Sequence, residues 1–356
     1  MDRRELLITL HGTHGIGWKT IDNVMKHGDL NDAIDFTEQD WESRGVAPAA
    51  ARNLIRSIRE ENRIEQQGRM KSKRIVPVTI FDEQYPILLK EISRPPWVLY
   101  TAGRLELLSQ FSIAMVGTRV PTAYGRKAGE MLAGSLAERG VNVVSGMARG
   151  IDGICHQAAL RSFGATTAVM GTAIDQPYPP ENRFLFEEIA EKGLIVSEYP
   201  IGTPSHPGMF PQRNRIIAGL SRGTVVVEAD ERSGSLITAD AALEANRDVY
   251  AVPGPITSPK SRGALNLIKQ GAKLITDARD ILEEYGFAPS ESRTADGNKL
   301  TEEELRIYHM LEQGNQTFDE LLTLTGWEFG LLHSVLLSLI IKKQAVQLPG
   351  SIYKLI

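Results

Sequence analysis

The strongest constraint on the fold lies between residues 111 and 285, where short apolar runs alternate with amphipathic stretches. The apolar runs contain consecutive apolar residues and are rich in Val and Ile, which is typical of parallel strands covered on both faces. The amphipathic stretches can serve as right-handed helical crossovers, so the pattern predicts a doubly wound α/β domain with a mostly parallel sheet. The predicted strands cover 112–117, 141–146, 165–171, 194–199, 223–229, 248–254 and 272–276, with helices near 123–139, 152–163, 181–192, 213–221, 235–245 and 263–270.

The chain before this domain carries helical signals. Apolar residues at helical spacing predict a small helical domain over 1–68, in which Gly15 and Gly17 form either a tight interhelical turn or a phosphate-binding turn at a helix start. Residues 52–74 hold eight basic and three acidic side chains, which suits a solvated helix face or a nucleic-acid contact. Successive prolines predict that 70–110 is an extended connecting segment.

The chain after the α/β domain is different in character. A polar linker is expected over 288–299, followed by three helical segments and a terminal hairpin, which together predict a winged-helix-like domain over 300–356. From 299 to 356 there are five basic and seven acidic residues. Because affinity for duplex DNA depends on neutralising phosphates, this acidic balance favours contact with a protein.

Composition narrows the possible functions. The chain has 42% hydrophobic and 24% charged residues, no apolar run of membrane-spanning length and no signal-peptide pattern, so we expect a cytoplasmic protein with no membrane contact. One cysteine and scattered histidines offer neither a disulfide nor a metal-ligand spacing. With a formal net charge of −4, any polyanion must be held by a local patch.

The loops after the predicted strands are the candidate binding elements, because ligands of doubly wound sheets bind beyond the carboxyl ends of the strands. These loops combine small residues, which let backbone amides approach an anion, with arginines and aromatic rings. The candidate phosphate-binding and DNA-binding residues are Gly117, Thr118, Arg119, Ser145, Gly146, Met147, Ala148, Arg149, Gly150, Gly171, Asn182, Arg183, Phe184, Phe210, Arg213, Asn214, Arg215, Ser233, Gly234 and Ser235. An alternative is that Arg213 and Arg215 are structural and pair with Glu198 and Glu228.

Catalysis is the less favoured interpretation. The main alternative to a binding protein is a Rossmann-like nucleotide hydrolase of the phosphoribohydrolase type. Thr238, however, stands where those enzymes carry a catalytic glutamate. Cys155 and His156 are adjacent on a predicted helix, so they face different directions and make a poor dyad. No loop has the GxGxxG spacing of a dinucleotide site. We therefore expect no catalytic residue, no metal and no cofactor.

Seven segments carry a resemblance to the DNA-processing protein A family, also called Smf. They are VGTR (116–119), SGMARGID (145–152), YPPEN (178–182), SEYPIG (197–202), FPQRNRIIAGLS (210–221), VVVEADERSGSLITA (225–239) and VPGPI (252–256). The resemblance implies an extended Rossmann-like core over 69–287, a SAM-like or helix-hairpin-helix-like N-terminal domain and a winged-helix C-terminal domain.

The same resemblance implies a function. It implies a homodimer that binds single-stranded DNA, protects incoming DNA and loads the RecA recombinase during natural transformation, without catalysis. Many relatives have a lysine directly after the asparagine of the YPxxN motif. Here Arg183 and Phe184 occupy that stretch, and either could face the DNA.

Overall fold

The computed structural model describes residues 1–27, 30–33, 35–162, 164–287, 300–342 and 344–355. Contacts divide the chain into two compact units, Met1–Tyr285 and Gly286–Ile356. The expected linker, 288–299, lies outside the described residues.

A nine-stranded sheet forms the centre of the first unit, in the order β1-β2-β6-β5-β4-β3-β7-β8-β9. In this sheet order, every neighbouring pair from β6 through β5, β4, β3, β7 and β8 to β9 is parallel. The pairs β1–β2 and β2–β6 are antiparallel. The predicted α/β class with a mostly parallel sheet is therefore confirmed. The strands are β1 (Val76–Thr79), β2 (Val98–Gly103), β3 (Ser112–Val116), β4 (Asn142–Ser145), β5 (Thr166–Met170), β6 (Leu194–Ser197), β7 (Gly223–Val226), β8 (Asp248–Ala251) and β9 (Lys273–Leu274).

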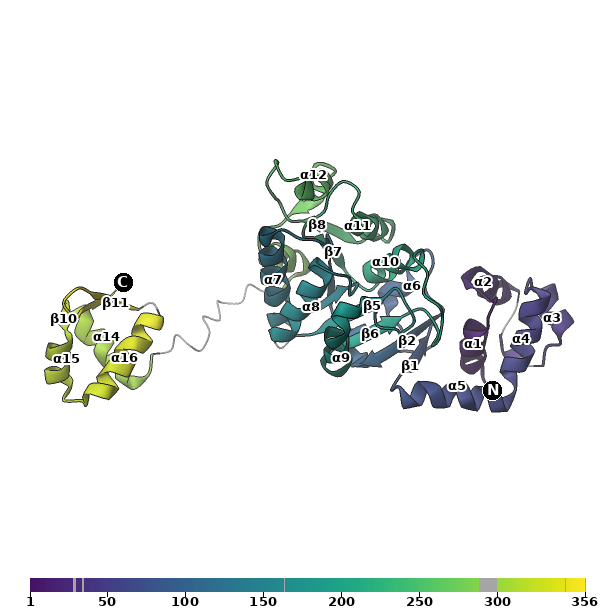
Figure 1. The fold of residues 1–356 in the computed structure, drawn as a ribbon, viewed down its shortest axis with the longest axis horizontal. Coiled ribbons are helices and arrows are strands. Elements are labelled where there is room, and N and C mark those ends of the chain that lie inside the picture. The colour runs from purple at the N-terminus through teal and green to yellow at the C-terminus, as the bar shows by residue number, and fades with distance from the viewer. Residues whose placement is uncertain (28–29, 34, 163, 288–299, 343, 356) are drawn as a thin grey trace. The chain divides into compact units, whose positions relative to one another are not determined.

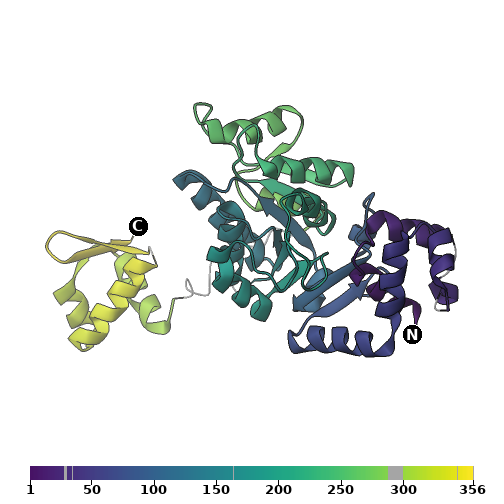
Figure 2. The same ribbon diagram turned by 45° about the vertical axis from the view of Figure 1, so that its right-hand side comes forward.

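Helices cover both faces of this sheet (Figures 1 and 2). Along β5, Ala168 and Met170 belong to one buried cluster and Val169 to another, because successive side chains of a strand point to opposite faces. This burial on both faces explains why the strands contain consecutive apolar residues instead of an alternating pattern. The helices are α7 (Ala123–Glu138), α8 (Ile151–Arg161), α9 (Arg183–Lys192), α10 (Met209–Gly219), α11 (Gly234–Glu244), α12 (Arg262–Lys269) and α13 (Arg279–Leu282).

The N-terminal helices bury apolar side chains in a cluster that continues into the α/β domain, where Ala168 and Ile195 belong to it. Leu6, Leu10, Trp41 and Leu54 are fully buried in it. Gly15 has a φ of +91° in the turn between the first two helices, a conformation that favours glycine. The helices are α1 (Arg3–Gly12), α2 (Trp18–Lys26), α3 (Glu38–Ser43), α4 (Pro48–Ile58) and α5 (Glu60–Ser72), with a 3₁₀ turn at Leu30–Ala33.

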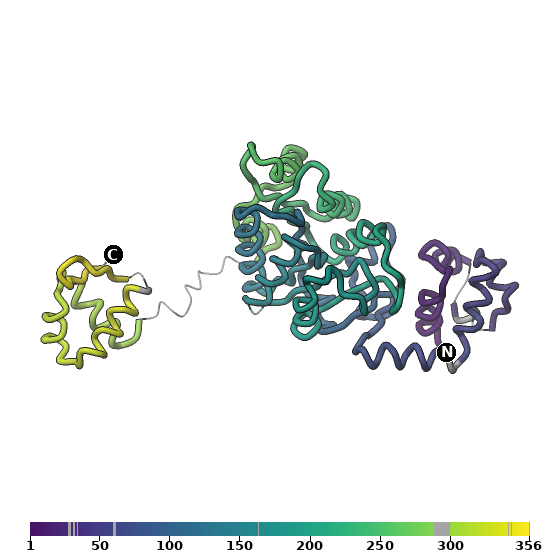
Figure 3. The backbone as a smooth tube through the Cα atoms, in the orientation of Figure 1, coloured from purple at the N-terminus to yellow at the C-terminus, as the bar shows by residue number. Residues whose placement is uncertain are grey.

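Two features differ from the sequence expectations. Helix α5 continues to Ser72, past the expected domain end at residue 68, and leads directly toward β1 (Figure 3). The segment 70–110, expected as an extended connection, contributes β1, the short α6 (Ile87–Lys90) and β2 to the structure. Pro77 is compatible with a strand here because β1 is at the edge of the sheet, where a missing amide donor costs no ladder bond.

The second unit contains α14 (Glu302–Glu312), α15 (Phe318–Thr325), α16 (Phe329–Ile341) and a small sheet of order β10-β12-β11. The expected terminal hairpin is present as β11 (Ala345–Leu348) and β12 (Ile352–Leu355). Strand β10 (Gln316–Thr317), which pairs with β12, was not predicted. Among the described helices, none is by itself long and apolar enough to span a membrane. Only Phe318–Thr325 and Phe329–Ile340 pass that criterion, jointly, as a pair bent by 118°.

Candidate functional site

A cavity of about 600 Å³ opens at the carboxyl edge of the parallel sheet, where the candidate loops were expected to meet. A smaller cavity of about 70 Å³ adjoins it and shares Arg119, Ala148, Tyr178, Phe210 and Arg213 with it. The candidate residues that line the larger cavity are Gly117, Thr118, Arg119, Ala148, Phe210, Arg213, Asn214, Ser233, Gly234 and Ser235. Gly146 and Arg149 line the smaller one.

Gly150 lets the loop after β4 pack closely against the loop after β3. It has a φ of +77°, and a Cβ atom there would lie 2.4 Å from the Thr118 carbonyl oxygen. The same carbonyl accepts a hydrogen bond from the Ile151 amide at 3.2 Å, and the Thr118 amide donates to the Glu228 carbonyl at 2.7 Å. This close contact fixes the loops after β3 and β4 and therefore the position of Arg119.

Arg119 is the exposed cation of the cavity wall. Within the part of the chain that the structure describes, its side chain makes no hydrogen bond and no ion pair. A guanidinium group carries five N–H donors in a planar fork that matches two oxygens of a phosphate. Arg119 is therefore available to bind an anion without first breaking a contact.

Two further arginines near this edge are paired at the surface. Arg149 forms an ion pair with Glu181, and the side chains are 59% and 56% exposed. Arg183 Nε lies 3.1 Å from Glu187 Oε1, one turn further along α9. Exposed pairs of this kind contribute little net stability, so both arginines can exchange their carboxylate for a phosphate at low cost.

Arg213 is buried, with only 5% of its surface exposed. Its Nη1 donates to the Gly146 carbonyl at 2.7 Å and also to the Val169 carbonyl, at the ends of β4 and β5. Burial lowers the pKa of Arg213 to about 10, while the Asp152 carboxylate acts in the opposite direction. The sequence placed Arg213 at a helix start, but α10 begins at Met209, so Arg213 lies in the second turn and points under the loops.

Asp152 balances this buried cation. It lies in the first turn of α8, and its Oδ2 accepts from the amides of Gly146 and Ala148 at 3.2 and 3.3 Å. Burial raises the pKa of Asp152, against the influence of Arg213 and of the two amides. A Cβ at Gly146 would lie within 2.7 Å of both side chains, so this position requires glycine.

Asn182 uses its amide group to hold a loop. Its Nδ2 donates to the carbonyls of Met147 and Ala148 at 2.8 and 3.3 Å. Met147 itself is buried, with a φ of +60°. The neighbouring Phe184 is 84% exposed, and Arg183 is also exposed, so both remain accessible to a ligand.

An aromatic pair that the sequence did not identify lines the cavity. The rings of Tyr178 and Phe210 have centroids 5.2 Å apart, and the Phe210 ring covers Gly171, where a Cβ would approach it to 2.5 Å. Tyr178 follows β5 in the Tyr-Pro-Pro segment. The sequence feature that could have identified it is an aromatic residue in a loop at the end of a strand. The same cavity is lined by the start of α11, where Ser233 caps the helix and its Oγ contacts Ser235 Oγ at 2.8 Å. Asn214 Nδ2 donates to the Gly234 carbonyl at 3.3 Å.

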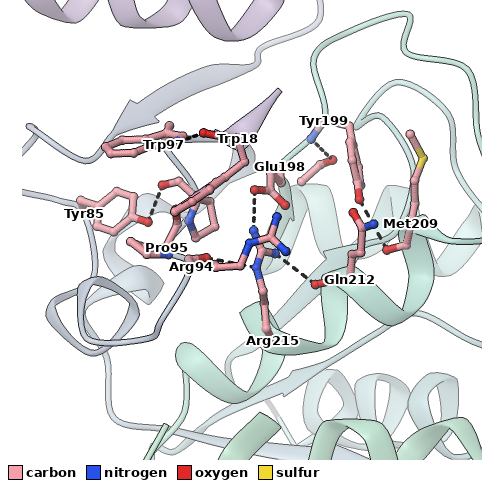
Figure 4. A network of polar contacts seen from close by, with 12 residues as sticks. Trp18, Tyr85, Arg94, Pro95, Trp97, Glu198, Tyr199, Met209, Gln212 and Arg215 are labelled. Carbon is pink, nitrogen blue, oxygen red and sulfur yellow. Dashed lines mark hydrogen bonds and ion pairs between the residues drawn. The ribbon is translucent and has the colours of Figure 1, made fainter. Parts of the chain in front are cut away.

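Arg215 lies in a different place from Arg119. It lines a second cavity of about 790 Å³ between the α1–α2 turn and the core, together with Trp18 and Arg94, and this cavity adjoins the carboxyl-edge cavity at Pro211 and Ile237. Figure 4 shows Arg215 directed at Glu198, with Nη2 to Oε1 at 2.6 Å, while Nε donates to the Arg94 carbonyl at 3.1 Å. The structural alternative is therefore confirmed for the pairing of Arg215 with Glu198.

The alternative in which Glu228 pairs with an arginine is wrong. The two oxygens of Glu228 accept from the Thr122 amide at 2.8 Å and from its hydroxyl at 2.6 Å, directly before α7. Gly125 in the first turn of α7 makes room for this carboxylate, since a Cβ there would lie 2.5 Å from Oε2. Glu228 thus anchors a helix start.

The groups considered for catalysis have structural environments. Cys155 is buried and burial raises the pKa of its thiol, while His156 Nδ1 contacts Thr166 Oγ1 at 2.6 Å. Thr238 is buried beside the cavity. Among the described residues, no group of three or more His, Cys, Asp and Glu side chains is arranged to hold a metal ion.

These features define an α/β protein with an arginine-rich, partly aromatic cavity at the carboxyl edge of its sheet. Residues 77–286 match the family model described as DNA recombination-mediator protein A. The chain belongs to this family.

Individual relatives support this assignment. The chain is 41% identical over 248 residues to the DNA processing protein DprA of Bacillus subtilis, covering 67% of this chain and 84% of that protein. It is 48% identical over 212 residues to Protein Smf of Synechocystis, but that match covers 58% of this chain and only 53% of the Smf protein. The alignment therefore spans about half the length of this relative.

Two solved structures are similar to the chain. The DprA structure from Streptococcus pneumoniae has a TM-score of 0.71 at 36% identity, covering 80% of this chain and 99% of that one. A DprA structure from Helicobacter pylori, whose description concerns its single-stranded DNA binding mode, has a TM-score of 0.54 at 31% identity and covers 59% of this chain and 95% of that one.

Proposed function

We propose that this protein is a recombination mediator that binds single-stranded DNA, with little sequence preference, in the cavity at the carboxyl edge of its sheet. The observation that carries the proposal is the exposed guanidinium of Arg119, which has no hydrogen-bond or ion-pair partner among the described residues and lines the same cavity as the Tyr178–Phe210 ring pair. A cation for the phosphate and rings for the base are the two elements with which proteins hold single strands without reading their sequence.

The shape of the site supports a single strand as ligand. Its volume of about 600 Å³ is in the range of small-ligand pockets, so it suits individual nucleotides whose bases are free to enter. In a duplex the bases are stacked and paired, and only the backbone would reach the cavity. The candidate residues Gly117, Ser145, Gly150, Ser233 and Ser235 then shape the loops around the strand.

Arg119→Ala tests the location of the site. Losing a charge-assisted phosphate bond costs about 1.5–3 kcal/mol, so we expect roughly tenfold or greater weakening of affinity for a dT oligonucleotide by fluorescence anisotropy. Arg139→Ala is the matched control, because Arg139 is also exposed but follows α7 at the amino edge of the sheet. Equal affinities of the two folded variants would contradict the assignment.

Tyr178→Ala tests the aromatic half of the same site. Stacking of one base on an aromatic ring contributes about 1–3 kcal/mol, so this variant should also bind the oligonucleotide at least several-fold more weakly. Tyr178→Phe should retain most of the affinity, because the ring is preserved. A loss of the same size in both variants would mean that the hydroxyl group, and not the ring, acts.

The wider role proposed for the chain follows its family. We propose that it acts in the cytoplasm as a homodimer, protects incoming DNA and loads the RecA recombinase during natural transformation. The acidic C-terminal unit is proposed to be a winged-helix domain that contacts protein. Sedimentation of the purified chain tests the dimer, and a RecA strand-exchange assay on protein-coated single strands tests loading.

The chain is also proposed to act without catalysis or cofactor. Support comes from Glu228, whose carboxylate is engaged by Thr122, and from Thr238 at the position where a catalytic glutamate would be needed. Incubation with nucleoside monophosphates should release no free base. Turnover that disappears in Glu228→Gln, with DNA affinity intact, would favour the nucleotide-hydrolase alternative.

A further inference from the structure

A second groove lies between α1 and α5, beside the edge strand β1, and has a volume of about 530 Å³. Its floor is aliphatic: Ile8, Met70 and Ile75 are buried there, and Val76 remains 43% exposed. Of the described residues, none lines both this groove and the carboxyl-edge cavity. The proposed DNA site therefore does not account for it.

Basic side chains surround this floor. Arg4, Arg63, Lys71 and Arg74 line the groove together with the acidic Glu5. Arg4 is neutralised by Asp82, because its Nε lies 2.8 Å from Asp82 Oδ1. The remaining balance is three positive charges against one negative charge. A concave apolar surface with a net positive rim is complementary to a segment that is apolar on one side and acidic on the other.

The basic residues of the rim are incompletely used by the fold. Arg63 Nη1 is 3.6 Å from Glu5 Oε2, and Arg63 Nε is buried without a hydrogen-bond partner. In the described part of the chain, Lys71 and Arg74 make no side-chain hydrogen bond or ion pair. An acidic ligand would supply acceptors for donors that the protein leaves open.

The chemistry of the floor decides between two classes of polyanion. Proteins that hold single-stranded nucleic acid stack its bases on aromatic rings. Among the residues that the structure describes, no aromatic side chain lines this groove. Aliphatic side chains and a methionine instead match the Leu or Ile anchors of an amphipathic helix lying in a groove. We propose that the α1–α5 groove is a docking site for an acidic amphipathic peptide segment of a partner protein.

The test uses the full chain and a synthetic probe. The probe is a fluorescein-labelled peptide with Leu at i, i+3, i+4 and i+7 and Glu elsewhere, compared with a peptide in which Ser replaces every Leu. Saturable binding of the Leu peptide, with little or no binding of the Ser peptide, is expected. Equal binding of the two peptides, or no saturable binding of the Leu peptide, overturns the proposal.

Variants locate the binding. Lys71→Glu places like charges together and should weaken the Leu peptide about tenfold or more, and Val76→Ser should weaken it by removing floor contact. Arg52→Glu is the matched control on α4, exposed and outside the groove lining, and should bind as the unaltered chain does. Unchanged circular dichroism and thermal melting show that each variant is folded.

A DNA arm separates this proposal from the proposed function. Lys71→Glu should leave the affinity for a dT oligonucleotide unchanged, whereas Arg119→Ala should lower it. If Lys71→Glu weakens the oligonucleotide and not the peptide, the groove belongs to the DNA path and the peptide proposal fails. If Arg119→Ala has no effect but the peptide results hold, the proposed DNA site fails alone.

Discussion

The carboxyl-edge cavity and the cavity below the α1–α2 turn both contain arginines from the same motif, yet they use them differently. At the carboxyl edge, Arg119 has no polar partner in the part of the chain that the structure describes, whereas the buried Arg213 donates to the carbonyls of Gly146 and Val169. In the cavity below the α1–α2 turn, called the junction from here on, Arg215 forms hydrogen bonds with Glu198 and with the Arg94 carbonyl. The difference indicates that Arg213 and Arg215 stabilise the fold, whereas Arg119 is available to bind a ligand.

The junction has the character of an internal packing surface. The rings of Trp18 and Trp97 stack at 5.7 Å, Trp18 Nε1 donates to the Pro95 carbonyl at 2.7 Å, and Arg94 covers the Trp18 ring (Figure 4). These contacts attach α2 to the segment before β2. The carboxyl-edge cavity instead leaves ring faces and a guanidinium open to solvent.

The sharpest way to break the comparison is Arg213→Ala. This change leaves the Gly146 and Val169 carbonyls without their donor and Asp152 without its nearby cation. Removing one partner of a buried charged set costs about 3–5 kcal/mol, which urea unfolding should detect as a large loss in the free energy of unfolding. Arg139→Ala should stay within about 0.5 kcal/mol of the unaltered chain. A stable Arg213→Ala protein would show that this arginine is not structural.

The buried region behind the cavity also predicts a pH dependence. His156 has no exposed surface, and burial, assisted by Arg213, lowers its pKa from 6.5 to about 3. Because the folded pKa lies below the unfolded value, the unfolded chain takes the proton first and stability falls as pH decreases from 6.5 toward 3. This group contributes a slope of up to about 1.4 kcal/mol per pH unit. An NMR titration of His156 with a midpoint near 6.5 would contradict the prediction.

Glu198→Gln sharpens the comparison at the junction. The Arg215 and Glu198 side chains are 20% and 12% exposed, so loss of the charge partner should cost about 1–2 kcal/mol of stability. A double-mutant cycle with Arg215→Ala should give a coupling energy of about 1 kcal/mol. DNA affinity should not change, because neither residue lines the carboxyl-edge cavity. A weakened oligonucleotide complex would extend the DNA site to the junction.

The sequence predicts the parallel sheet and the loops of the site, because double burial and small residues leave clear local patterns. It does not reveal which polar side chains form hydrogen bonds or ion pairs within the folded protein. Arg119 of VGTR and Arg213 and Arg215 of FPQRNR are all arginines in loops or helix starts after strands. The geometry shows that, among the described residues, Arg119 has no polar partner, whereas Arg213 is buried and Arg215 is paired. Strands β1 and β2 were missed because prolines interrupt their surroundings, and Tyr178 because its contact with Phe210 spans 32 positions of the chain.

The most direct measurement is the salt dependence of single-stranded DNA binding for the unaltered chain, Arg119→Ala and Glu198→Gln. On single strands each phosphate contact contributes a slope of about −0.7 in the plot of log affinity against log salt concentration. We expect Arg119→Ala to reduce the steepness by about 0.7 and Glu198→Gln to leave it unchanged. An identical slope in Arg119→Ala and the unaltered chain would contradict the claim that phosphates bind at the carboxyl edge of the sheet.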